Sequence, residues 1–147
     1  MKKRVLILLI ILSIVLISFP LFIFIKYPPE KLGKIEINEN AVVEVIDGDT
    51  FKLGSEEIVR LICVDAPEKG KRGYEEAKEF LTDMILDKEV RLEKDVSDKD
   101  EYGRLLRYVY VNISGAEFFV NQQLLQEGYA KVFRYGNDTS KCREIEG

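Results

Sequence analysis

Two short clusters of polar residues hold the side chains that could do chemistry. The first is residues 47–50, an Asp-Gly-Asp-Thr turn, and the second is residues 60–68, which contain an arginine, an aspartate and a glutamate. Both clusters follow apolar, β-branched runs, so the sequence predicts that they lie where strands run out into turns. Carboxylates bind hard divalent cations, and guanidinium groups bind phosphate oxygens. The expected chemistry is metal-assisted cleavage of a phosphodiester.

A third cluster, residues 100–104, places Arg104 two residues after the aromatic ring of Tyr102. Simpler readings exist for two of the clusters. An Asp-Gly-Asp sequence is common in hairpin turns, and residues 98–103 resemble the first half of an EF-hand loop. The twelfth position of that loop is Val109 instead of a glutamate, which argues against an EF-hand.

The chain contains no histidine. Nucleases with a histidine base, Ser-His-Asp hydrolases and zinc sites with histidine ligands are therefore excluded. Acid–base work falls to carboxylates, and oxygen-ligated Ca²⁺ or Mg²⁺ is favoured over zinc or copper.

The first 26 residues predict a membrane anchor, because residues 5–25 form a run without a charged residue. Such a run can cross a hydrocarbon core of ~30 Å as a helix. The cations at positions 2–4 favour a single-pass orientation with the domain outside. A cleaved signal peptide, and with it secretion, is the alternative, because Pro20 interrupts the run. Residues 27–33 are expected to be a linker, and residues 34–147 the folded domain.

Charge limits how the domain could meet nucleic acid. Residues 35–147 hold 25 acidic and 16 basic side chains, a formal charge of −9. Broad binding through a basic surface is therefore not expected. A local site with a cation and two arginines remains compatible with this charge. Residues 69–72 are expected to be a solvated loop, with contact to a phosphate backbone as the alternative.

The pattern predicts an α+β, mainly β domain, a five-stranded OB-type barrel with an inserted helix. Residues 73–86 have the spacing of an amphipathic helix, and Asn121 is expected to cap a second helix that stops at Gly128. The first strand is expected over residues 34–38 and 41–46, with a break at residues 39–40, and the other four over residues 50–53, 57–64, 89–93 and 105–111.

The two cysteines are Cys63 and Cys142. Cys63 lies in an apolar run and is expected to be a buried core residue of the barrel wall. A disulfide between the two is the alternative.

Taken in order, the three clusters resemble those of the staphylococcal nuclease (thermonuclease) family, over residues 41–133. The matching segments are 45–50, 59–68, 100–104 with 108–110, and 120–132. The resemblance implies calcium-dependent hydrolysis of single-stranded DNA or of RNA, leaving 3′-phosphates, by a protein expected to be a monomer.

The resemblance also implies a role for each site residue. Asp49, Asp65 and the Ala66 carbonyl would bind Ca²⁺, with Asp47 close to them but not in direct contact with the ion. Glu68 would be the general base, and Arg60 and Arg104 would clamp the phosphate.

Two aromatic residues, Tyr102 and Tyr135, would lie beside the substrate. A tyrosine that relatives often use falls at or near Arg134 here, and residues 141–146 are shorter than the C-terminal helix expected of relatives. In an ideal strand Arg60 and Asp65 would point to opposite faces, so a shared site requires the strand to twist, bulge or end between them.

Two alternatives to an enzyme stay open. One is a non-catalytic OB-type module that binds nucleic acid or a protein. The other is an envelope protein in which the anchor is the functional part.

Overall fold

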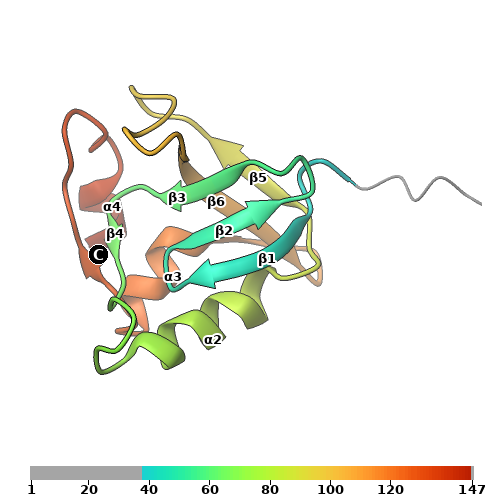
Figure 1. Ribbon diagram of the computed structural model, residues 1–147, viewed down its shortest axis with the longest axis horizontal. Coiled ribbons are helices and arrows are strands. Elements are labelled where there is room, and N and C mark those ends of the chain that lie inside the picture. Colours follow the sequence, from blue (N-terminus) through green and yellow to red (C-terminus); the bar gives the residue numbers. More distant parts are fainter. Residues whose placement is uncertain (1–37, 147) are drawn as a thin grey trace, which may run out of the picture. The chain divides into compact units, whose positions relative to one another are not determined.

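The computed structural model describes residues 38–146 (Figure 1). The anchor predicted over residues 1–26, the linker over residues 27–33 and nearly all of the strand expected over residues 34–38 lie outside the described residues. Within the described part, no helix is long and apolar enough to span a membrane.

The domain is built on one six-stranded sheet. Its first three strands form an antiparallel meander, and the third pairs in parallel with the long strand β6, which also pairs with β5 and β7. The strands are β1 (Val42–Asp47), β2 (Thr50–Leu53), β3 (Ile58–Leu61), β5 (Val90–Glu93), β6 (Leu105–Ile113) and β7 (Ala116–Phe119).

The predicted α+β class is confirmed, but the sheet does not close into the predicted OB-type barrel. The two ends of the sheet, β1 and β5, approach each other at a single bridge between Ala41 and Glu89 and do not form a ladder. The sequence pattern did not predict strand β7. It forms a hairpin with β6 and pairs with the edge of β6 opposite to β5.

Helix α2 (Tyr74–Ile85) matches the predicted helix over residues 73–86 and packs against β1 (Figure 1). Its apolar side buries residues Ala77, Leu81, Met84 and Ile85. The Asp47–Asp49 turn lies against this helix. A Cβ atom added to Gly48 would lie 2.7 Å from the Cβ atoms of both Ala66 and Ala77, so only glycine allows the close approach.

Helix α3 (Val120–Gln126) ends before Gly128, whose φ of 77° confirms the predicted helix stop. The predicted cap at Asn121 is wrong, because Phe119 precedes the first turn and Asn121 lies inside the helix, fully buried. Its side chain accepts a hydrogen bond from Val109 N–H and donates one to the Ile62 carbonyl. Asn121 therefore ties α3 to the sheet.

A two-stranded ribbon follows the main sheet, made of β4 (Val64–Asp65) and β8 (Lys131–Val132). The last described element is a short helix, α4 (Cys142–Glu146). Residues Cys142 and Ile145 of that helix pack with Ile62, Leu106 and Tyr108 in a second, smaller apolar cluster.

Candidate active site

The chain breaks between β3 and β4, and this break brings Arg60 and Asp65 together. The strand expected over residues 57–64 stops at Leu61, and Ile62 and Cys63 form a turn in which Cys63 has a φ of 62°. Arg60 Nη2 then lies 3.8 Å from Asp65 Oδ1. The strand ends before Asp65, as a shared site requires.

The same turn confirms that Cys63 is buried but corrects its expected place in the barrel wall. Cys63 is buried, but it forms a disulfide with Cys142 of α4, and their Cα atoms are 5.4 Å apart. Because Cys63 lies in a turn and not in a strand, its side chain meets α4. The Cys63 carbonyl also accepts a hydrogen bond from Phe133 N–H, so the turn is held to the segment that follows β8.

Asp49 is a buried carboxylate with several partners. Its Oδ2 lies 2.5 Å from Arg60 Nη1 and accepts a hydrogen bond from Ala66 N–H at 2.8 Å, and its Oδ1 accepts one from Thr50 at 3.0 Å. Asp47 accepts a hydrogen bond from the Asp49 N–H. Burial raises the pKa of Asp49 to about 6, against the opposing effects of Arg60 and the Ala66 N–H, and the charge of Asp47 adds to the rise.

Arg60 is the counterpart of this carboxylate, but its own donors are not all used. Among the described residues, its Nη1 is the one buried side-chain nitrogen or oxygen that lacks a hydrogen-bond partner. The contact with Asp49 is close, but it does not have hydrogen-bond geometry. A buried donor without an acceptor is costly, and an anionic ligand oxygen would remove that cost.

The carboxylates near Arg60 are the type of ligand that a hard cation prefers, but they are too few to fill its coordination sphere. Asp47, Asp49 and Asp65 offer only oxygen, although burial, which raises the pKa of Asp49, disfavours the ionised form that would bind a cation. Within residues 38–146, however, no three acidic, cysteine or histidine side chains converge as metal ligands. An ion here would therefore need main-chain oxygen and water as well.

The loop before β6 presents the second arginine. Asp100 accepts hydrogen bonds from the N–H groups of Tyr102 and Arg104 and from Arg104 Nε, the last at 2.7 Å. The guanidinium carbon of Arg104 lies 5.3 Å from the centre of the Tyr102 ring. Tyr102 is 77% exposed, so its ring is free to meet a ligand.

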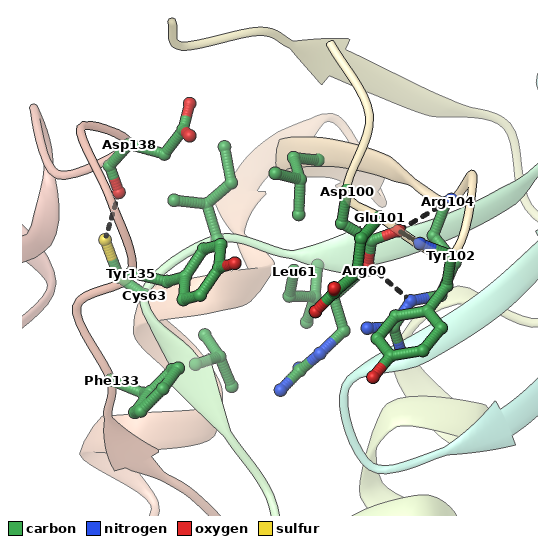
Figure 2. A pocket seen from close by; sticks show the side chains of 13 residues that line it. Arg60, Leu61, Cys63, Asp100, Glu101, Tyr102, Arg104, Phe133, Tyr135 and Asp138 are labelled. Carbon is green, nitrogen blue, oxygen red and sulfur yellow. Dashed lines mark hydrogen bonds and ion pairs between the residues drawn. The ribbon is translucent and has the colours of Figure 1, made fainter. Parts of the chain in front are cut away.

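Four of the predicted residues line one pocket of 190 Å³, here called the aromatic pocket: Arg60, Arg104, Tyr102 and Tyr135. Figure 2 shows Arg60 between the 100–104 loop and the segment that carries Phe133 and Tyr135. The rings of Phe133 and Tyr135 stack with their centres 6.4 Å apart, and both are about half exposed. Phe133, which the sequence analysis does not name as a site residue, also lines the pocket.

Glu68 lies elsewhere. It is exposed and lines a second hollow together with Asp65 and Ala66. Among the described residues, no ion pair or hydrogen bond joins its carboxylate to Arg60 or Arg104. The structure therefore brings the two arginines into one pocket and leaves the predicted base next to it.

This arrangement can be compared with known proteins. The profile of a family described as "Staphylococcal nuclease homologue" matches residues 58–146. The chain belongs to this family. The predicted resemblance is thereby confirmed, and so is the expectation of a nuclease-type hydrolase that acts on phosphodiester bonds.

Individual relatives agree with the family match. A thermonuclease of Staphylococcus hyicus is 35% identical over 99% of this chain and 90% of its own length. A thermonuclease of Staphylococcus intermedius is 42% identical over 64% of this chain and 59% of its own length. An endonuclease of Bacillus subtilis, YncB, is 38% identical over 59% of this chain, which spans only 44% of that relative.

Proposed function

We propose that this protein is a calcium-dependent nuclease that cleaves single-stranded DNA or RNA. The observation that carries the proposal is that Arg60 and Arg104 line one pocket, where Arg60 is held at Asp49 by charge and not by a hydrogen bond. Two guanidinium groups in one pocket fit the two free oxygens of a phosphodiester, and fixed cations stabilise the charge that this group gains during cleavage.

The proton chemistry falls to a carboxylate, because the chain has no histidine. Glu68 is exposed and shares its hollow with Asp65, so it can accept a proton from a water molecule that approaches the phosphate. The role does not require a contact between Glu68 and the arginines, since a base has to reach the water and not the guanidinium groups.

Asp49, Asp65 and the Ala66 carbonyl would hold Ca²⁺, with Asp47 behind Asp49. When bound, the ion would act as a Lewis acid and lower the pKa of its water. The chain's own residues align the phosphate through Arg60 and Arg104 and offer Tyr102 and Tyr135 as rings beside the bases. Burial raises the pKa of Asp49, and a bound cation would oppose this shift by favouring the ionised carboxylate.

A membrane-anchored enzyme that faces outward is part of the proposal. Its support is the uncharged run of residues 5–25 after three early cations, and a calcium-rich exterior suits the metal. Added protease should remove the domain from intact cells. Protection there, with digestion after lysis, would mean that the domain faces inward.

The experiment that tests the activity is incubation of the full-length protein with a labelled single-stranded oligonucleotide, with calcium and with a chelator. We expect cleavage only with calcium, and in Asp49→Asn and Asp65→Asn variants a higher calcium concentration for half-maximal rate. The alternative is a non-catalytic binding module, which the separation of Glu68 from the arginines favours. Tight binding without cleavage by a folded protein would support that alternative.

A further inference from the structure

A second hollow, of 340 Å³, lies next to the aromatic pocket and is here called the basic hollow. One wall is the end of β4 and the loop that follows it, with Asp65, Glu68, Lys71 and Arg72. The opposite wall is the segment from Gly128 to Lys131, which leads from α3 into β8.

The β4–β8 ribbon separates the two hollows. Val64 lines the aromatic pocket, and the next residue, Asp65, lines the basic hollow, because successive side chains of a strand point to opposite faces. On the partner strand, Lys131 lies opposite Asp65 and lines the basic hollow. Phe133 lies just after that strand, outside its alternation, and lines the aromatic pocket. A strand of nucleic acid that leaves the arginines past Asp65 would therefore enter the basic hollow.

The charge of the basic hollow is unusual for this acidic domain. Lys71, Arg72 and Lys131 all line it, and within residues 38–146 none of the three has a carboxylate within 4.0 Å. Even Asp65, which faces Lys131 across the ribbon, lies beside Arg60 instead. Three cations therefore line one hollow and outnumber its two carboxylates, those of Asp65 and Glu68, with none of the three cations in an ion pair among the described residues.

The basic hollow suits a phosphate better than a base. Its one aromatic side chain, Tyr129, is already stacked on Phe80, with ring centres 4.5 Å apart. The aromatic pocket shows the opposite composition, with three exposed rings at Tyr102, Phe133 and Tyr135. Bases would stack in one hollow, and cations would hold the sugar-phosphate backbone in the other.

We propose that the basic hollow is a backbone-phosphate subsite, in which Lys71, Arg72 and Lys131 bind the phosphates that flank the scissile one in a single strand. This inference rests on the proposed nuclease function. It predicts that the protein prefers strands over substrates with one phosphodiester, because a dinucleotide has no further phosphate to place in the hollow.

The test measures binding of a fluorescent single-stranded 15-mer to the full-length protein with Glu68→Gln, which slows cleavage, across a range of salt concentrations. Adding Lys71→Ala, Arg72→Ala and Lys131→Ala should weaken binding roughly tenfold at low salt. It should also reduce the slope of log K against log salt by about 2, since each neutralised single-strand phosphate contributes ~0.7. In the protein that keeps Glu68, the three substitutions should lower kcat/KM for the 15-mer roughly tenfold, as for binding. For a dinucleotide, kcat/KM should fall by less than about twofold.

A matched control removes three charges elsewhere. Lys78, Lys94 and Arg143 likewise have no carboxylate within 4.0 Å among the described residues, and they line neither hollow. Their triple alanine variant should change the slope by less than half as much. Equal losses in both triple variants, or no loss in either, would overturn the subsite. If the wild-type protein never cleaves but the slope still changes selectively, the nuclease proposal fails and the subsite stands.

Discussion

Arg60 Nη1 and Asp49 Oδ2 lie 2.5 Å apart, yet this nitrogen makes no hydrogen bond within the described residues. The pair is thus held by charge at a poor donor angle. Its geometry differs from that of Arg104, whose Nε donates directly to Asp100. Arg104 is thus anchored by a directed hydrogen bond, whereas Arg60 is held at its carboxylate by charge alone.

Replacing Arg60 with lysine should impair turnover more than folding. Lysine keeps a positive charge near Asp49 but loses the planar fork, so kcat/KM for single-stranded DNA should fall by ~10²-fold. Steady-state cleavage and thermal melting measure the two effects. Arg143→Lys, on the exposed side of α4, is the control and should leave both unchanged. Wild-type turnover in Arg60→Lys would remove Arg60 from the phosphate site.

Glu68→Gln should abolish most of the turnover without a cost in stability. The side chain is exposed, so the free energy of unfolding should change by less than about 0.5 kcal/mol. Loss of the general base should lower kcat by ~10²-fold or more. Single-turnover cleavage at saturating calcium measures this, with Glu75→Gln in the first turn of α2 as the control. An unchanged rate would show that another group takes the proton.

Acid should loosen the 100–104 loop. Burial opposes ionisation of Asp100, but the hydrogen bonds from Arg104 and then from Tyr102 outweigh it, so the pKa of Asp100 lies below its usual value. A carboxyl with a lowered pKa stabilises the fold above its unfolded pKa, and the contribution is lost as the pH falls through the folded pKa. Between pH 7 and pH 3, the wild type should therefore lose stability that Asp100→Asn already lacks. Urea unfolding at both pH values measures this difference, and equal pH dependence in the two proteins would contradict it.

The sequence pattern predicted the features that depend only on residues close together in the chain. The amphipathic spacing of residues 73–86 gave α2, and the Asp-Gly-Asp turn follows from the residue types at positions 47–49. The separation between the two hollows could not be predicted in this way. It depends on the break at Cys63 and on the pairing of β4 with β8, two strands of two residues each whose partners are far apart in the chain.

The cysteines and Asn121 show the same limit. Treating Cys63 as part of a continuous strand placed its side chain in the barrel wall, and only the turn at Ile62 and Cys63 directs it to α4. An asparagine before an apolar run is a common helix cap. Here, however, the side chain of Asn121 bonds to Val109 of β6 and to Ile62 of the turn, and the helix begins one residue before it. The predicted role of each site residue stays a prediction for the experiments above.

The disulfide should stabilise the wall of the aromatic pocket. It closes a loop with a sequence separation of 79 residues, for which chain entropy gives about 4 kcal/mol. The double variant Cys63→Ala, Cys142→Ala should lose stability of that order in urea unfolding. Reduction of the wild type with a dithiol should reproduce the loss. No change in the reduced wild type would mean that the two thiols are not paired in the protein.

Asn121→Ala should destabilise the domain by about 2–4 kcal/mol. The substitution leaves the Val109 N–H and the Ile62 carbonyl buried without these partners, and each such group costs about 1–3 kcal/mol. Because Ile62 belongs to the turn between Arg60 and Asp65, the rate at saturating calcium should fall as well, even at temperatures where the variant is folded. Gln126→Ala, exposed at the end of α3, is the matched control and should change stability by less than about 0.5 kcal/mol. A loss of stability in Asn121→Ala with an unchanged rate would show that Asn121 supports the fold but does not position the turn.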